Sequence, residues 1–157
     1  MVEINLSPMT EDDFNEMMVA GIIRYAEENV KAGYWTTDES LKRSRETHDR
    51  VLPKGLSTEG HHFYNAVDPA DGTVAGHIWF KEEPGSDRKA FIYDVFIKDE
   101  HRGKGYGKAM MLALISLAKA ADFSSLALHV FASNRTALHL YESLGFEIKS
   151  MNMIKQM

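Results

Sequence analysis

The sequence predicts a single α/β domain, residues 1–157, in which helices flank one mixed, mostly antiparallel sheet. Three observations predict this class. Apolar residues recur at helical spacing between residues 10 and 52, and they alternate with a period of two between residues 61 and 97. Beyond a glycine-rich turn, a strand–helix–strand step requires a right-handed crossover and a parallel pair of strands.

The first third of the chain predicts a short strand and two helices. Residues 2–6 alternate as a strand. Thr10 with Asp13 forms a capping box for a helix that ends near residues 31–33. A second box at Thr36–Glu39 opens a helix that runs to about Leu52, just before a proline.

The remainder predicts strands that begin near residues 61, 73 and 89 and form a meander, with Gly72 in the first turn. An almost wholly apolar helix follows Lys108 and should pack on the sheet. A strand over residues 125–131, a helix over residues 136–145 and a last strand over residues 146–155 complete the chain. The predicted order is β-α-α-β-β-β-α-β-α-β.

Composition excludes several classes of protein. The net charge of −5 argues against a nucleic-acid-binding protein, which usually presents a broad basic face. The absence of cysteine excludes disulfides, thiolate metal sites and a cysteine nucleophile. The N-terminus does not resemble a signal peptide and no apolar run approaches 18 residues, so we expect a cytoplasmic protein without a membrane partner.

The most informative stretch is Ala90–Lys108, where a strand runs through three glycines into a helix. Alternating glycines leave backbone N–H groups accessible, and a helix N-terminus attracts anions. Three cationic side chains surround the same turn: Arg102, Lys104 and Lys108. The stretch therefore predicts a site for a phosphate-bearing ligand.

Three known glycine-rich sequence patterns bind phosphate-bearing ligands and can be compared with this stretch. The ATP/GTP loop requires a hydroxyl residue after Gly-Lys, and none follows Lys108. The dinucleotide fingerprint requires G-x-G-x-x-G, whereas Gly103, Gly105 and Gly107 have closer spacing. The third pattern, Arg-x-x-Gly-x-Gly, is present from Arg102 to Gly107.

This third pattern resembles the acetyl-CoA loop of the GCN5-related N-acetyltransferase (GNAT) superfamily. A second family hallmark, N-x-x-A-x-x-L-Y-x-x-x-G-F, is matched by Asn134, Ala137, Leu140, Tyr141, Gly145 and Phe146. The resemblance extends from about His62 to Lys155. It implies a sheet of six to seven strands with about four helices, a CoA-binding part over residues 62–155, and N-terminal helices, residues 10–52, that shape the acceptor site.

The family resemblance implies direct transfer of an acetyl group from acetyl-CoA to a primary amine, with no metal. Backbone N–H groups of the strand Val95–Ile97 would align the thioester and stabilise the tetrahedral oxyanion. The implied cofactor-binding residues are Val95, Phe96, Ile97, Arg102, Gly103, Lys104, Gly105, Tyr106, Gly107, Lys108 and Asn134. Asn134 is also suited to be an N-cap.

Tyr141 is the candidate general acid for the departing thiolate, because a phenol with a pKa near 10 can protonate a thiolate whose conjugate acid has a pKa near 8.5. Its position on an apolar helical stripe also fits a core residue. For the base that deprotonates the amine, His129 is the first candidate, in place of a glutamate found there in some family members. Asp94 and Glu28 are rivals, and a water chain could replace all three.

The acceptor cleft is expected to include Glu28, Tyr34, Trp35 and His77. The acceptor is a small-molecule or peptide amine, and the resemblance allows a monomer or a homodimer. A non-catalytic acyl-CoA-binding or sensing module on the same fold is the alternative function, because fold alone does not determine function. An intact Tyr141 argues against that alternative.

Overall fold

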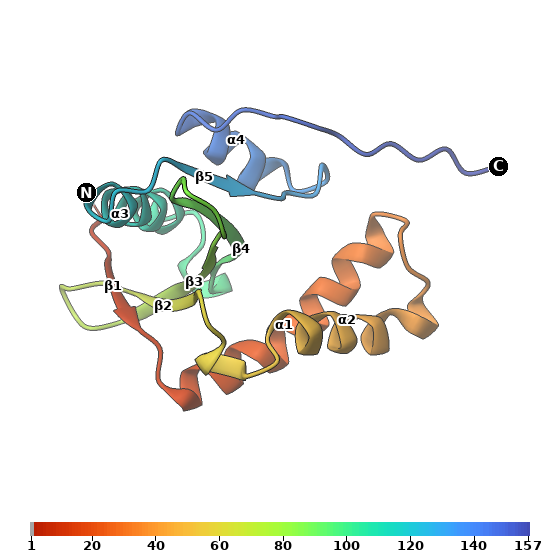
Figure 1. The fold of residues 1–157 in the computed structure, drawn as a ribbon, viewed down its shortest axis with the longest axis horizontal. Coiled ribbons are helices and arrows are strands. Elements are labelled where there is room, and N and C mark those ends of the chain that lie inside the picture. Colours follow the sequence, from red (N-terminus) through yellow and green to blue (C-terminus); the bar gives the residue numbers. More distant parts are fainter. Residues whose placement is uncertain (1) are drawn as a thin grey trace. The chain divides into compact units, whose positions relative to one another are not determined.

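The computed structural model describes residues 2–157 and contains one five-stranded sheet and four α-helices among them (Figure 1). The chain divides into two compact units. The first unit consists of the residues up to Glu16 together with Leu52–His129, and the second of Met17–Val51 together with Val130–Met157. The first unit holds the whole sheet.

The strands of the first unit follow one another across the sheet in chain order. They are β1 (Asn5–Pro8), β2 (His61–Val67), β3 (Val74–Glu82), β4 (Lys89–Ile97) and β5 (Ser125–Leu128). The first four pair antiparallel, and β5 pairs parallel to β4. The predicted meander and parallel pair are therefore confirmed.

The turn between β2 and β3 is built as its sequence predicts. Gly72 adopts a φ of 77°, a conformation that favours glycine, and its N–H donates to the Asp68 carbonyl at 2.9 Å. The N–H of Asp68 donates to the carbonyl of Thr73 at 2.8 Å and closes the loop. This closure sets the register that leads from β2 into β3.

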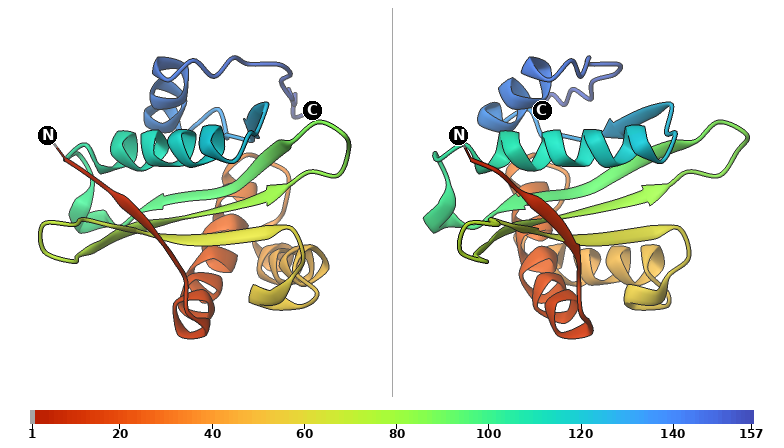
Figure 2. Two further views of the ribbon diagram at one scale, coloured as in Figure 1. Left: turned by 60° about the vertical axis from the view of Figure 1, so that its left-hand side comes forward. Right: turned by 90° about the vertical axis from the view of Figure 1, so that its left-hand side faces the viewer.

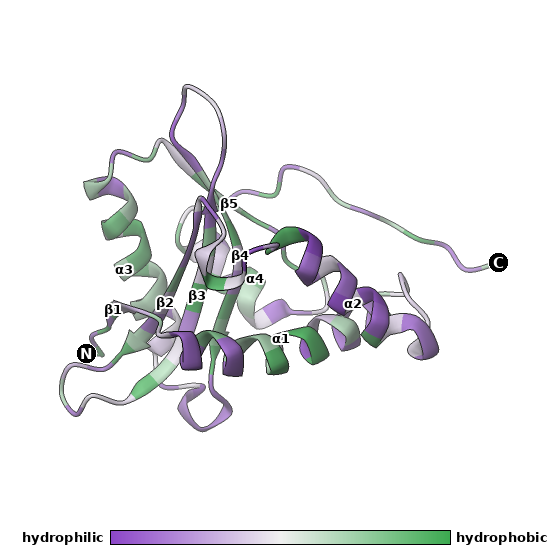
Figure 3. Ribbon diagram, turned by 60° about the horizontal axis from the view of Figure 1, so that its bottom comes forward, coloured by the Kyte–Doolittle hydropathy of each residue, from purple (hydrophilic) through white to green (hydrophobic). Residues whose placement is uncertain are grey.

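The apolar helix α3 (Tyr106–Ala120) lies along one face of the sheet in both views of Figure 2. Met110, Met111 and Leu114 are completely buried. Figure 3 shows the helix coloured as hydrophobic over most of its length. Burial of these three side chains stabilises the fold by roughly 1.5–3 kcal/mol each, which explains why a helix with little polar surface packs here.

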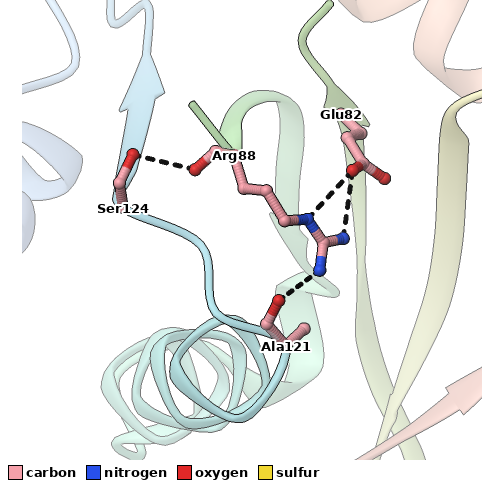
Figure 4. A network of polar contacts seen from close by, with 4 residues as sticks. All are labelled: Glu82, Arg88, Ala121 and Ser124. Atoms are coloured by element: carbon pink, nitrogen blue, oxygen red, sulfur yellow. Dashed lines mark hydrogen bonds and ion pairs between the residues drawn. The ribbon is translucent and has the colours of Figure 1, made fainter. Parts of the chain in front are cut away.

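Arg88 connects the β3–β4 turn to the far end of α3 (Figure 4). Its guanidinium pairs with Glu82 at 3.0 Å and donates to the carbonyl of Ala121. The hydroxyl of Ser124 donates to the Arg88 carbonyl at 2.9 Å, directly before β5 begins. These bonds hold the start of β5 beside β4.

The second unit is helical and contains most of α1 (Glu11–Lys31) together with α2 (Thr37–Val51) and α4 (Arg135–Ser143). The Ser44 hydroxyl donates to the Ile22 carbonyl at 2.6 Å and ties α2 to α1. At the first-unit end of α1, Thr10 and Asp13 exchange reciprocal hydrogen bonds of 3.0 and 3.2 Å. The predicted capping box is confirmed. No helix among residues 2–157 is long and apolar enough to cross a membrane.

Two predictions about strands are wrong. The sheet has five strands rather than six to seven, because residues 146–155 form no strand. The order therefore ends at α4, and β5 stops at Leu128 rather than at residue 131. An alternating pattern suits a strand, but a strand exists only where a neighbouring edge accepts its hydrogen bonds, and no described segment pairs with residues 146–155.

Candidate acyl-transfer site

Among residues 2–157, the end of β4 has a neighbouring strand on one side only. Pairing of β4 with β5 stops at Ile92–Leu128, whereas β4 continues to Ile97 and remains paired with β3. Trp79 pairs with Asp94 and Phe80 with Ile92, so Tyr93 is the extra residue of a β-bulge. Such bulges redirect a strand and its side chains. Residues 95–97 therefore present a strand edge that an extended ligand could complete.

Gly76 allows β3 to approach this segment closely. Gly76 pairs with Ile97, and a Cβ atom at Gly76 would collide with the carbonyl oxygen of Phe96. The neighbouring atom is backbone, so the strand itself would have to move. The role of Gly76 could not be predicted from the sequence, since nothing in its local pattern distinguishes it from other residues of the strand.

The loop after β4 forms an anion cradle. Gly103 and Gly105 have φ values of 73° and 88°, which disfavour any residue with a side chain. Gly105 is the N-cap of α3 and contributes no side-chain bond; the N–H of Ala109 donates to its carbonyl at 3.1 Å. The first N–H groups of α3 are consequently available to an anion.

Arg102 and Tyr106 fold back onto their surroundings. The Nε of Arg102 donates to the Ile97 carbonyl at 3.0 Å and its guanidinium pairs with Asp99 at 3.3 Å. The hydroxyl of Tyr106 donates to Asp68 at 2.8 Å, and this bond raises the pKa of the phenol. Both side chains therefore brace the loop, while Lys104 and Lys108 are exposed cations around it.

The same sheet carries a polar pair, which was not predicted as a pair. The Nε2 of His77 on β3 lies 2.7 Å from Oδ2 of Asp94 on β4. The sequence predicts the two residues in separate roles, His77 in the acceptor cleft and Asp94 as a candidate base. Antiparallel pairing with a bulge brings them together.

An aromatic cluster adjoins this pair. The Trp79 ring stacks on Tyr93 with 4.7 Å between centroids, and its Nε1 donates to Nδ1 of His61 at 2.9 Å. His61 is buried, and burial, followed by the nearby charges of Lys81 and His62, lowers its pKa to about 4. His61 is therefore neutral at pH 7.

His129, the first candidate base, follows the end of β5 and is exposed. It was expected inside a strand, and this expectation is wrong, because β4 and β5 separate at that point. Its proposed role as a base is a separate matter and remains a prediction.

In the second unit, Asn134 caps α4, as its side chain accepts from the N–H of Ala137 at 3.3 Å. The helix ends in a Schellman motif. The N–H of Phe146 donates to the Tyr141 carbonyl at 3.0 Å, and the N–H of Gly145 donates to the Glu142 carbonyl at 3.1 Å. Gly145 has a φ of 92°, as its predicted C-cap role requires.

Tyr141 is buried, and its ring lies 5.8 Å from that of Phe146. Tyr141 is therefore a core residue of the second unit, as its position on an apolar helical stripe predicted. A buried phenol can still act as an acid, so the packing does not decide its chemical role.

The expected cleft residues of the second unit lie on α1 and on the connection to α2. Glu28 is on α1, and Tyr34 is 39% exposed. The Trp35 ring contacts Tyr25 edge-on with 5.5 Å between centroids, and the guanidinium of Arg43 lies 5.1 Å above it. Packing within the unit accounts for Trp35, whereas Tyr34 presents an accessible ring.

Comparison with known proteins identifies the family. The model of the acetyltransferase (GNAT) family matches residues 26–146. The chain is 36% identical over 155 residues to the uncharacterized N-acetyltransferase YycN of Bacillus subtilis, covering 98% of this chain and 99% of that protein. It is 31% identical to YdgE of the same organism, covering 97% of each chain.

A crystal structure of YycN superposes with a TM-score of 0.94 over 98% of both chains. A putative acetyltransferase of Pyrococcus furiosus, 22% identical, has a TM-score of 0.68 and covers 99% of this chain. The family model, the two relatives matched over nearly their whole length and the superposed crystal structure all indicate the same family. The chain belongs to the GNAT family and is an acetyltransferase.

Proposed function

We propose that this acetyltransferase transfers an acetyl group from acetyl-CoA directly to a primary amine. The observation that carries the proposal is the continuous path from the one-sided end of β4 into the cradle at Gly103 and Gly105. An extended thioester-bearing arm pairs with residues 95–97, and its pyrophosphate accepts from the N–H groups that open α3. The cradle provides backbone donors, left-handed glycines and nearby lysines, and these suit a phosphate anion.

The chemical roles follow from the demands of acyl transfer. A backbone N–H in the segment 95–97 stabilises the oxyanion that develops on the thioester carbonyl. Tyr141 protonates the departing thiolate, as its position in the family motif and its phenol chemistry favour. Asn134 caps the helix that carries Tyr141 and contributes to the cofactor site. The candidate bases are His129, Asp94 and Glu28.

The acceptor is a small-molecule or peptide amine. Direct attack on the thioester is favoured over an acyl-enzyme on cysteine, since the chain contains no cysteine. The net charge of −5 favours the approach of cationic amines. Tyr34, with its exposed ring, is proposed to line the acceptor cleft together with Glu28, Trp35 and His77.

Release of free thiol from acetyl-CoA, followed across a panel of primary amines, tests this function. We expect amine-dependent thiol release and the mass of an acetylated product. Binding of acetyl-CoA without turnover on any amine of the panel would instead favour an acyl-CoA-binding module.

Substitutions of one lysine in the glycine loop and one in the first turn of α3 test the location of the cofactor. Lys104→Gln and Lys108→Gln should each weaken acetyl-CoA binding several-fold at low salt, since they remove a charge beside the pyrophosphate. Lys119→Gln is the matched control, because this exposed lysine lies at the other end of the same helix. Equal effects of all three substitutions would contradict the assigned site.

A further inference from the structure

His77 and Asp94 form a hydrogen-bonded pair next to the segment that we assign to the thioester. His77 pairs with Phe96 across the β3–β4 ladder, and Asp94 pairs with Trp79 two residues along, so both side chains lie on one face. Their Nε2···Oδ2 distance is 2.7 Å. The side chains are 11% and 21% exposed, which makes the pair largely but not wholly shielded from water.

Two contacts fix the orientation of the imidazole. Asp94 holds one edge, and the ring of Phe96 stacks on the imidazole with 5.3 Å between centroids and 28° between planes. Four other charged side chains of the first unit lie near this face. Arg102 is 5.5 Å above Phe96, and Asp13 accepts from Asn65, the residue paired with His77. Lys98 acts on Asp13, and Lys81 acts on His61, which accepts from Trp79. The ring is therefore held by packing as well as by the hydrogen bond.

The hydrogen bond also selects a tautomer. An ionised carboxylate only accepts hydrogen bonds, so Nε2 of His77 carries the proton and Nδ1 carries the lone pair. Among residues 2–157, Asp94 supplies the hydrogen bond of this ring. Every fully buried side-chain nitrogen or oxygen in that range has a hydrogen-bond partner. Because Nδ1 of His77 has none among these residues, this atom is not fully buried and is in contact with solvent. An oriented, accessible lone pair is what a general base requires.

The position of the pair along the strand matches that role. Asp94 directly precedes Val95 and follows Tyr93, the extra residue of the bulge. The bulge lies just where β4 continues beyond its pairing with β5. His77 and Asp94 are thus adjacent to the strand edge at which the thioester is proposed to lie.

We propose that His77 is the catalytic base that deprotonates the acceptor ammonium, with Asp94 as its positioning residue. This proposal rests on the proposed function and replaces His129 as the first candidate. An N–H bond of the ammonium breaks and an Nδ1–H bond forms, which leaves an imidazolium paired with the Asp94 carboxylate. The freed lone pair attacks the thioester carbonyl. The carbon–sulfur bond then breaks, Tyr141 protonates the departing thiolate, and the Tyr141 phenolate takes the second proton from the newly acylated nitrogen. His77 returns its proton to water.

A base on the enzyme matters most for amines of high pKa. At pH 7 only about one in 2,500 lysine-type amines, with a pKa near 10.4, is neutral. For an α-amine, with a pKa near 7.8, the neutral fraction is about one in seven. The dyad therefore points to strongly basic alkylamines as the acceptor class.

Two isomeric probes separate this role from a structural one. Nα-acetyl-lysine amide offers only an ε-amine, and Nε-acetyl-lysine amide offers only an α-amine, with identical composition. His77→Gln should lower kcat/KM at pH 7 by at least about 100-fold on the first probe and by less than about 10-fold on the second. The deficit on the ε-amine should shrink as the pH rises toward the pKa of that amine, because free amine then becomes available without a base.

Two controls distinguish the proposed effect from misfolding and from a nonspecific loss of activity. His62→Gln changes a neighbouring histidine that stacks on Phe80, on the alternate face of the sheet, and should leave both rates unchanged. Acetyl-CoA affinity of His77→Gln should equal that of the parent chain. Equal losses on both isomers, or the same losses in His62→Gln, would overturn the proposal.

Nitrogen-15 NMR of the histidine rings tests the dyad without turnover. In the parent chain neutral His77 should be the Nε2–H tautomer, and Asp94→Asn should convert it to a mixture. The Nδ1–H tautomer in the parent chain would refute the dyad. Failure of the proposed function has a different signature, namely no thiol release by the parent chain on either isomer, and the tautomer measurement alone then decides the dyad.

Discussion

At the residue scale, Tyr141 combines a packing role with a proposed chemical one. Its ring packs on Phe146, and its carbonyl accepts the bond that terminates α4. The packing depends on the ring, whereas the proposed acid depends on the hydroxyl. A substitution that removes only the hydroxyl separates the two.

Tyr141→Phe should therefore lower kcat ten-fold or more with little change in acetyl-CoA affinity, because the ring contact survives and the acid is lost. Steady-state thiol release and equilibrium binding measure the two quantities. Tyr64→Phe, a partly buried tyrosine on β2, serves as the control for loss of a phenol elsewhere. Unchanged turnover in Tyr141→Phe would contradict the proposal that Tyr141 is the general acid.

The protonation of His61 should make the stability of the fold depend on pH. Its folded-state pKa of about 4 lies below the usual histidine pKa of 6.5, so the unfolded chain binds a proton more readily between these values. Stability is therefore lost as the pH falls from 6.5 toward 4. The loss attributable to this residue should be about 2 to 3 kcal/mol between pH 7.5 and pH 4.5.

His61→Gln tests this linkage, because glutamine can still accept from the Trp79 indole but does not titrate. Urea unfolding at pH 7.5 and pH 4.5 should show a smaller pH effect in the variant than in the parent chain. Parallel pH dependences in the two proteins would show that His61 is not responsible.

At the scale of the element, the geometry of β4 depends on its neighbour β3. A Cβ atom at Gly76 would strike the carbonyl oxygen of Phe96, so Gly76→Ala must displace the segment that we assign to the thioester. We expect a destabilisation on the order of 1–3 kcal/mol together with weakened acetyl-CoA binding. Thermal unfolding and ligand titration measure these effects.

Gly21→Ala is the matched glycine control, because Gly21 lies in α1 and a Cβ there would meet only the flexible Arg24 side chain, at 4.0 Å. That change should stabilise the chain by roughly 0.5–1 kcal/mol. If Gly76→Ala were as well tolerated as Gly21→Ala, close approach of β3 to β4 would not matter for the site.

Elements whose signals are local could be predicted from the sequence. The Thr10–Asp13 box and the Gly145 C-cap depend on bonds between residues a few positions apart, and both are confirmed. The strand predicted over residues 146–155 is wrong because a strand depends on a distant partner rather than on nearby residues. Alternation in residues 146–155 describes a side-chain pattern, whereas strand formation requires a partner elsewhere in the chain.

At the scale of the whole molecule, binding of acetyl-CoA should stabilise the folded chain. A ligand at one hundred times its Kd contributes about 2.7 kcal/mol, which corresponds to a rise in Tm of roughly 5–10 °C for a chain of this size. Differential scanning fluorimetry of the parent chain with and without acetyl-CoA measures the shift. A shift equal to that of Lys104→Gln at the same concentration would contradict a specific role of the cradle.

The sequence by itself determined the family and the parts of the site that depend on nearby residues. The spacing from Arg102 to Gly107 predicted the cradle, and Asn134 with Tyr141 matched the second motif of the family. Helix caps and glycine turns were equally predictable, since their hydrogen bonds join residues close in the chain.

Only the tertiary structure decided how separate strands meet. His77 and Asp94 are 17 positions apart and contact one another because the register of β3 with β4 includes a one-residue bulge. Pairing of β4 with β5 stops at Ile92, and this leaves the edge on which the proposed thioester site depends. Register and pairing arise from contacts between distant segments, and a shift of one residue would turn each side chain to the other face of the sheet.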